Sequence, residues 1–190
     1  MNNLINNVGQ VNKIFLKSFV NEGDIVIDAT VGNGHDTVFL NSLIKKSGKI
    51  YAFDIQEDAI NSTRKLLIEN NINNVELINN GHENIDKYVF DKISCAVFNL
   101  GYLPTGDKTI VTKSETTIAA IKSCLELLNN NGIISISIYS GHEGGEIEKS
   151  LVYEFVKSLD QKKFNVLSNT FLNQKNTPPE LILIEKKITK

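Results

Sequence analysis

The sequence predicts an α/β fold in which helices cover both faces of a mostly parallel sheet that ends in an antiparallel hairpin. Short runs rich in Ile, Val and Phe alternate with helix-length segments, which is the pattern of repeated β–α–β units. The last two apolar runs have no helix-length segment between them, so we expect them to pair directly at the sheet edge. The 190 residues are 41% hydrophobic, which indicates a folded chain, and we expect a single domain over residues 1–190.

The elements follow from periodicity and stop signals. A helix over residues 11–20 precedes a first strand at 24–29. Apolar residues at 38, 39, 43 and 44 recur at helical spacing, and Gly48 then ends a helix predicted over 36–46. The remaining helices are expected at residues 56–70, 114–128 and 146–159. The remaining strands are expected at residues 49–55, 75–78, 93–100, 133–139, 164–172 and 180–186.

Composition and charge exclude several classes of protein. No apolar stretch reaches the roughly 18–20 residues that cross a bilayer, and the N-terminus resembles no signal peptide, so a cytoplasmic location is expected. Cys95 and Cys124 have neither disulfide-framework nor metal-ligand spacing, and the three histidines show no metal-ligand spacing either. The net charge of −2 excludes a generally basic nucleic-acid coat, and Arg64 is the only arginine, so an RNA substrate would be held mostly by lysines.

A glycine-containing turn follows the first predicted strand, with the sequence DATVGNGHD over residues 28–36. Gly32 and Gly34 allow a tight turn and a close backbone approach to a ligand. Thr37 stands where a dinucleotide-binding fingerprint needs its third glycine, and no phosphate-binding loop is present. Asp28 would repel a pyrophosphate but suits a ligand with a cationic amino group, such as S-adenosylmethionine.

Two further strand ends complete a candidate cofactor site. Asp54 ends the second strand, where a carboxylate accepts both ribose hydroxyls in many nucleotide-binding folds. NAD enzymes use the same device, so Asp54 indicates a ribose and leaves the cofactor open. Gly81 and His82 follow the third strand and suit an adenine edge. An ordinary glycine turn and helix-capping aspartates remain the alternative for these positions.

The candidate acceptor site follows the fourth strand. The Asn99 side chain there can accept hydrogen bonds from a substrate amine, and Tyr102 can stack on a base. Asp107 and Lys108 extend the same loop and are read either as a proton acceptor and a phosphate contact or as solvated charges. Tyr139 and His142 flank another turn, at the end of the fifth strand, and a polar loop spans residues 173–179. No cysteine lies in these loops, which disfavours covalent pyrimidine C5 methylation.

These motifs together resemble one family. The segments 28–36, 53–56, 81–82, 99–108, 139–145 and 174–179 are similar to those of the YtqB/MnmM family of class I S-adenosylmethionine-dependent methyltransferases, often labelled rRNA methylases. The resemblance implies a Rossmann-like methyltransferase fold with seven strands. It also implies a substrate, 5-aminomethyluridine or its 2-thio form at the tRNA wobble position, in the anticodon region. The product would be 5-methylaminomethyluridine.

The resemblance also assigns residues. It places Asn33, Asp36, Asp54, Gln56 and His82 at the cofactor, beside the residues Asp28, Gly32, Gly34 and Gly81 named above. It places the 99–108 and 139–145 loops at the acceptor. The expected catalytic residues are Asn99, Tyr102, Asp107 and His142, and the expected substrate contacts are Leu100, Gly101, Lys108, Tyr139, Gly141, Gln174 and Asn176.

Several alternatives stay open. Asp107, His142 or water can accept the proton of the amine. The substrate can instead be rRNA or a small-molecule or protein amine, which the net charge and the single arginine favour slightly. A non-catalytic nucleotide-binding module and an NAD-dependent oxidoreductase are weaker rivals, and a homodimer stays open as the assembly.

Overall fold

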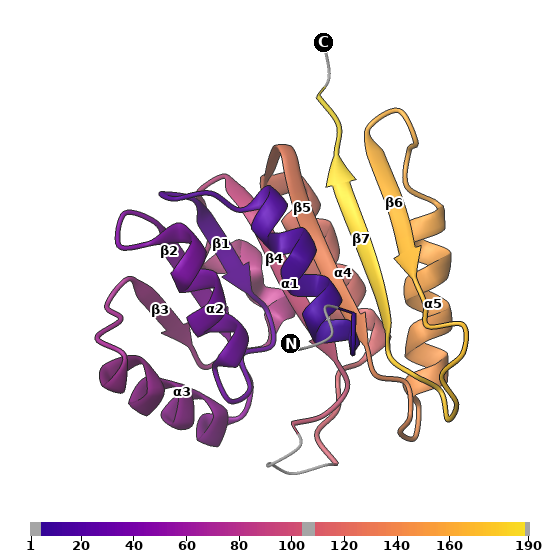
Figure 1. Cartoon of the computed structure of the whole chain (residues 1–190), viewed down its shortest axis with the longest axis horizontal. Coiled ribbons are helices and arrows are strands. Elements are labelled where there is room, and N and C mark those ends of the chain that lie inside the picture. Colours follow the sequence, from indigo (N-terminus) through magenta and orange to yellow (C-terminus); the bar gives the residue numbers. More distant parts are fainter. Residues whose placement is uncertain (1–4, 104–108, 189–190) are drawn as a thin grey trace.

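A computed structural model describes residues 5–103 and 109–188 of the chain. Within these residues seven strands form one sheet in the order β3-β2-β1-β4-β5-β7-β6, and the predicted fold class is confirmed (Figure 1). The strands are β1 Ile25–Asp28, β2 Lys49–Phe53, β3 Val75–Ile78, β4 Ile93–Leu100, β5 Leu128–Ile138, β6 Phe164–Asn169 and β7 Glu180–Lys186. The helices are α1 Val8–Phe19, α2 His35–Ile44, α3 Glu57–Glu69, η1 His82–Lys87, α4 Ser114–Leu127 and α5 Gly145–Lys157.

The strand order reverses direction at two neighbouring central strands, β1 and β4. β1 pairs in parallel with β2 on one side and with β4 on the other. The chain therefore runs outward from β1 to β3 and returns to start again at β4. In open α/β sheets, ligands bind at the carboxyl ends of the strands where the order reverses in this way. The end of β1 and the end of β4 are consequently the place to look for a site.

Both faces of the sheet are buried. Val26 belongs to one apolar cluster and Ile27 to another, and along β4 Cys95 and Phe98 alternate between the same two clusters. The first cluster contains residues of α1 and α2, and the second contains residues of η1, α4 and α5. In Figure 1, α1 and α2 lie in front of the sheet and α4 lies behind it. Because successive side chains of a strand point to opposite faces of the sheet, alternate residues enter two separate cores.

The C-terminal hairpin is antiparallel, as predicted. β7 pairs antiparallel with β5 and with β6, so it lies between them and β6 forms the edge. Four consecutive residues of β7 are buried, whereas β6 is mostly exposed. None of the helices in residues 5–103 and 109–188 is both long and apolar enough to cross a membrane.

Two element starts differ most from the sequence prediction, and one short helix was not expected. α1 begins at Val8 because the Asn7 side chain accepts the Gln10 amide and caps the helix. β5 begins at Leu128, since Leu128 pairs with Ile93 across an irregularity in the ladder. The short 3₁₀ helix η1 was not predicted, because a single turn of mixed residues carries no periodic signal.

Candidate functional site

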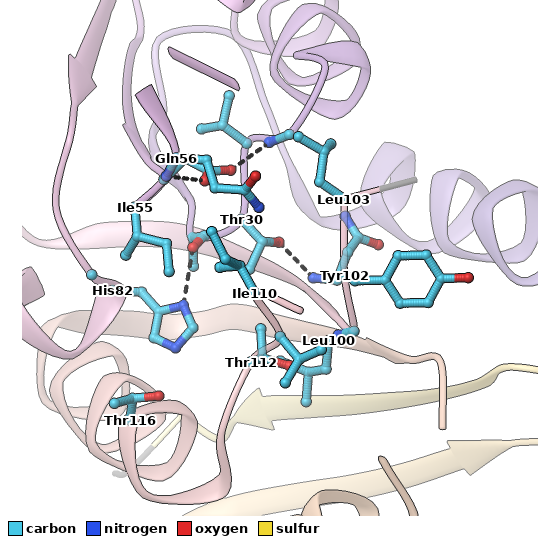
Figure 2. Close-up of a pocket in the computed structure, with 18 of the residues that line it drawn as sticks. Thr30, Ile55, Gln56, His82, Leu100, Tyr102, Leu103, Ile110, Thr112 and Thr116 are labelled. Carbon is cyan, nitrogen blue, oxygen red and sulfur yellow. Dashed lines mark hydrogen bonds between the residues drawn. The ribbon is translucent and has the colours of Figure 1, made fainter. Parts of the chain in front are cut away.

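A cavity of about 540 Å³ opens at the carboxyl ends of β1 and β4, a size typical of small-molecule sites. Figure 2 shows Ile55, Gln56 and His82 on one side of it and Leu100, Tyr102 and Leu103 on the other, with Thr30 between them. Among the residues expected at the site, the cavity wall contains Gly32, Asn33, Asp36, Asp54, Gln56, Gly81, His82, Asn99, Leu100, Gly101, Tyr102 and Tyr139. The structure therefore brings most of the predicted cofactor and acceptor residues to one pocket.

The Asp54 carboxylate joins the glycine turn to the start of α3. One oxygen accepts the Gly32 amide at 2.9 Å and the other accepts the Gln56 amide at 2.9 Å. Each carboxylate oxygen can accept a second hydrogen bond, so Asp54 can still bind two hydroxyl groups of a ligand. Burial raises the pKa of the Asp54 carboxyl, and the two backbone amides oppose that rise.

The two glycines of the turn adopt left-handed backbone conformations, with φ of 52° at Gly32 and 77° at Gly34. A Cβ on Gly34 would lie 2.8 Å from the Thr63 side chain, and Thr63 itself donates to the Gly32 carbonyl at 3.1 Å. Gly34 therefore lets α3 approach the turn and lies outside the cavity wall, whereas Gly32 is on the wall. The structure thus explains Gly34 by a helix contact, and the expected contact of Gly34 with a ligand stays a prediction.

Asp28 lies beneath the turn rather than in the cavity. Its side chain is fully buried and accepts the Thr37 hydroxyl at 2.6 Å and the Thr30 amide at 3.3 Å. Burial, and then the charge of Asp36, raises the pKa of Asp28 to about 7. The expectation that the Asp28 carboxylate contacts a cationic ligand directly is therefore wrong. The sequence could not show this, because the Thr37 contact comes from the facing helix.

His82 is a residue of the cavity wall, and one of its two ring nitrogens has a protein partner. Its Nδ1 lies 3.2 Å from the Ala29 carbonyl oxygen, which can only accept, so Nδ1 carries the hydrogen. Burial lowers the pKa of His82, which favours the neutral ring, and the Phe98 ring packs edge-on against it. The Nε2 atom is buried with no protein partner. This nitrogen is therefore a buried hydrogen-bond acceptor, without a partner, in a residue of the cavity wall.

Asn99 is held in one orientation by two contacts. Its backbone amide donates to the Thr30 hydroxyl at 2.7 Å, and its side-chain Nδ2 donates to Asp36 Oδ2 at 2.9 Å. Because a carboxylate accepts, the amide nitrogen must face Asp36, and the amide oxygen must face the other way. An amide held so can accept a hydrogen bond from a substrate N–H group.

A segment that sequence reasoning missed closes the cavity from the α4 side. Tyr102 forms a β-bridge with Val111, and Gly101 and Thr112 exchange hydrogen bonds of 2.9 and 3.0 Å. Glu148, which is 4% exposed, accepts the hydroxyls of Thr112 and Thr117 at 2.7 and 2.8 Å. The wall also contains residues that the sequence analysis did not name one by one as site residues, some of them inside the predicted segments 28–36, 53–56 and 99–108: Ala29, Thr30, Val31, His35, Ile55, Asn80, Glu83, Leu103, Ile110, Val111, Thr112, Lys113 and Thr116.

Several predicted residues lie elsewhere. Asp107 and Lys108 fall outside the described residues. His142 is not on the cavity wall; its ring packs edge-on against Tyr102, and its Nδ1 lies 2.9 Å from the Glu143 carbonyl oxygen. Gly141, Gln174 and Asn176 are likewise not on the wall. His142 therefore supports Tyr102 instead of facing the cavity.

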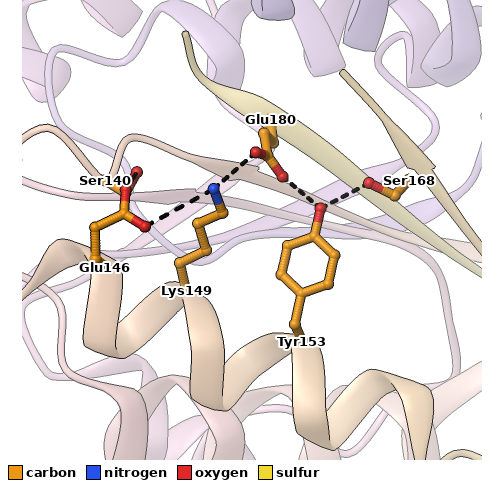
Figure 3. A network of polar contacts seen from close by, with 6 residues as sticks. All are labelled: Ser140, Glu146, Lys149, Tyr153, Ser168 and Glu180. Atoms are coloured by element: carbon orange, nitrogen blue, oxygen red, sulfur yellow. Dashed lines mark hydrogen bonds and ion pairs between the residues drawn. The ribbon is translucent and has the colours of Figure 1, made fainter. Parts of the chain in front are cut away.

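A polar network behind these loops connects α5 to the hairpin. Ser140 donates to Glu146, and Lys149 pairs with Glu180 at 2.7 Å. Tyr153 also donates to Glu180 and contacts Ser168. In Figure 3, Lys149 and Tyr153 project from α5 toward Glu180 at the start of β7. The network fixes the end of the 173–179 loop relative to the turn at residue 140.

Comparison with known proteins gives a consistent result. A family model described as "Putative rRNA methylase" matches residues 50–185. A relative from Arabidopsis thaliana, the chloroplastic tRNA (mnm(5)s(2)U34)-methyltransferase, is 33% identical over 189 residues, which is 94% of this chain and 69% of the relative.

Two crystal structures are also similar. An rRNA-methylase of the same description from Clostridium thermocellum is 49% identical with a TM-score of 0.94, over 96% of this chain and 98% of that one. A Streptococcus mutans methyltransferase in complex with SAH is 46% identical with a TM-score of 0.87, over 98% of this chain and 99% of that one.

Proposed function

The chain belongs to the "Putative rRNA methylase" family, of the YtqB/MnmM type, and is an S-adenosylmethionine-dependent methyltransferase. From this premise we propose that it is an N-methyltransferase that acts on tRNA. In this proposal it converts 5-aminomethyluridine, or the 2-thio form, at the wobble position to 5-methylaminomethyluridine. Residues 1–190 then act as one domain, in the cytoplasm, with the anticodon region of tRNA as the partner.

The residues of the cavity fit the cofactor. Asp54 retains acceptor capacity for two ribose hydroxyls, and the buried, unpartnered His82 Nε2 is an acceptor for an adenine amino group. Ile55 supplies an apolar surface on the same wall, on which a base can pack. When bound, S-adenosylmethionine supplies a methyl group on a sulfonium, which is already a good leaving group.

The protein itself therefore has to align the acceptor nitrogen with the methyl group and to bind the charged groups of the reaction. A methyl transfer needs the acceptor nitrogen in line with the methyl and its lone pair free. The Asn99 amide oxygen can accept an N–H of the acceptor and so direct the lone pair, since Asp36 fixes the amide orientation. Tyr102 and Tyr139 are 39% and 41% exposed on the cavity wall, where they suit stacking on a nucleobase turned out of its strand.

The observation that carries the proposal is the oriented Asn99 amide in the cavity that contains Asp54. The name of the Arabidopsis relative, a tRNA (mnm(5)s(2)U34)-methyltransferase, supports tRNA as the substrate and the modified wobble uridine as the target. The family description favours rRNA as a second candidate, which the same experiment separates.

The test is methyl transfer from labelled S-adenosylmethionine to bulk tRNA from cells that lack this gene, followed by nucleoside mass spectrometry. We expect label in 5-methylaminomethyluridine. Label in rRNA alone, with none in tRNA, would contradict the proposal. Asn99→Ala should slow single-turnover transfer by about a hundredfold while calorimetry finds cofactor affinity within a few-fold of wild type. An unchanged transfer rate would remove Asn99 from the mechanism.

The assembly state is tested separately. A homodimer stays a prediction, and light scattering coupled to gel filtration distinguishes it from a monomer.

A further inference from the structure

Asp36 belongs to the acceptor side of the cavity by its contacts. It lies in the first turn of α2, on the cavity wall. Its Oδ2 atom accepts the Asn99 side-chain amide at 2.9 Å. Resemblance alone assigns Asp36 to the cofactor. Within residues 5–103 and 109–188, however, its side chain bonds to Asn99, the residue proposed to align the acceptor nitrogen.

The charge of Asp36 acts on two neighbours from different elements. Burial is the largest cause that raises the pKa of Tyr139, which follows β5, and the charge of Asp36 is the second largest. It is also the second cause that raises the pKa of Asp28, at the end of β1. The contact with Asn99 and the shared cavity wall with Tyr139 place Asp36 beside the ends of β4 and β5. A positive charge placed there would be favoured.

Other titratable groups bound the same cavity. His35 precedes Asp36 on α2, and Lys113 approaches from the segment before α4. Asp54, His82 and Glu83 lie on the side of β2 and β3. Within the described wall, Asp36 is the carboxylate bonded to Asn99, so it is the one placed to meet a substrate group that Asn99 also binds.

We propose that Asp36 pairs with the cationic acceptor amine and stabilises the positive charge that the nitrogen gains during methyl transfer. This inference rests on the function proposed above. A primary alkylamine has a pKa near 10, so the acceptor arrives mostly as ammonium. Asp36 and the Asn99 amide oxygen then hold it by its N–H groups, which selects an ammonium-bearing substrate over a neutral base.

The bound ammonium loses one proton to water, which frees its lone pair. The lone pair forms the new N–C bond while the bond between sulfur and the methyl carbon breaks, and that electron pair stays on sulfur. The positive charge thus moves from sulfur to nitrogen, toward Asp36, and a fixed carboxylate stabilises such a developing charge. The product leaves as a secondary ammonium.

Asp36→Asn tests the inference cleanly. The asparagine oxygen can still accept the Asn99 Nδ2, so the side-chain contact survives and only the charge is removed. Asp36→Glu keeps the charge. Glu57→Gln is the matched control, because Glu57 is an exposed carboxylate in the first turn of α3 and lies off the cavity wall. Circular dichroism and thermal melting verify folding of each variant.

The readouts are calorimetric affinity for S-adenosylmethionine and single-turnover transfer to tRNA carrying 5-aminomethyluridine, measured across pH. In Asp36→Asn we expect the rate at the high-pH plateau to fall by about a hundredfold. The inflection of the pH profile should move down by about one to three units, because the paired carboxylate no longer favours the ammonium. Cofactor affinity should stay within threefold of wild type, Asp36→Glu should keep the wild-type inflection, and Glu57→Gln should match wild type throughout.

Three results would overturn the inference, and they are distinguishable. A cofactor affinity lowered tenfold or more with an unmoved inflection assigns Asp36 to the cofactor. An unchanged rate and profile removes it from the reaction. Wild-type protein that binds the cofactor but transfers nothing to this tRNA refutes the proposed function, and the inference falls with it.

Discussion

Asp28→Asn tests whether a buried carboxyl beneath the site makes stability depend on pH. The side chain is fully buried, with the Thr37 hydroxyl at 2.6 Å and the Thr30 amide at 3.3 Å as donors. Burial, and then Asp36, raises the pKa of Asp28 from 3.8 to about 7. Asparagine has nearly the same shape and never ionises, so it reproduces the protonated acid.

The magnitude follows from linkage. A carboxyl whose pKa is higher in the folded state binds its proton more tightly there, so its stabilisation is complete below the unfolded pKa. That stabilisation is lost as pH rises through the folded pKa near 7. A rise of about three units corresponds to about 4 kcal/mol. We therefore expect Asp28→Asn to match wild type near pH 4 and to be more stable by several kcal/mol near pH 8.

Urea unfolding at several pH values between 4 and 8 measures the difference. The chain has no tryptophan, so far-UV circular dichroism is the suitable signal. Taking wild type minus variant at each pH cancels the titration of the other groups. Two parallel curves, with a constant difference across the range, would refute the reasoning that Asp28 is a buried, titrating carboxyl.

Three further predictions concern the turn, the buried glutamate and the ribose site. Gly34→Ala should lower the free energy of unfolding by about 2 kcal/mol or more, because φ is 77° and the new Cβ would lie 2.8 Å from Thr63. Gly141→Ala is the control, since the space around Gly141 is open. Equal effects of the two substitutions on stability would contradict this explanation. Glu148→Ala should destabilise by about 3 kcal/mol, because it leaves the hydroxyls of the partly buried Thr112 and the buried Thr117 without their acceptor. Urea unfolding measures the change, and a neutral result would show that the contacts are unimportant. Asp54→Ala should weaken cofactor binding by about a hundredfold, since hydrogen bonds to a charged group contribute about 1.5–3 kcal/mol each; intact affinity by calorimetry would exclude the assigned ribose contact.

The parallel strands and the glycine turn were predictable because their signals are local. Apolar runs bounded by turn residues mark buried strands, and Asp54 follows its strand directly. The start of β5 was missed because residues 129–131 are three exposed asparagines, of which Asn131 has φ of 60°. Such residues suggest a loop, and only the pairing of Leu128 with Ile93 extends the strand.

The missed site residues depend on tertiary contacts. Ile110 to Lys113 reach the cavity because Tyr102 pairs with Val111 and because Glu148, from α5, holds Thr112. No local pattern in the sequence predicts that residues 110–113 come back to the cavity. His142 was expected in the cavity because it follows a strand end, but the direction of a loop side chain depends on its neighbours, here the ring of Tyr102.

The position of β7 has a consequence for how the protein is made. β6 precedes β7 in the chain, yet β7 separates it from β5 in the sheet. While a ribosome is still translating residues 164–179, the free edge of β5 has no correct partner, and pairing with β6 would be an error. An unpaired apolar edge of this kind attracts other chains. Until residues 180–186 can pair with β5, that edge of the nascent sheet therefore stays open to the strands of other chains.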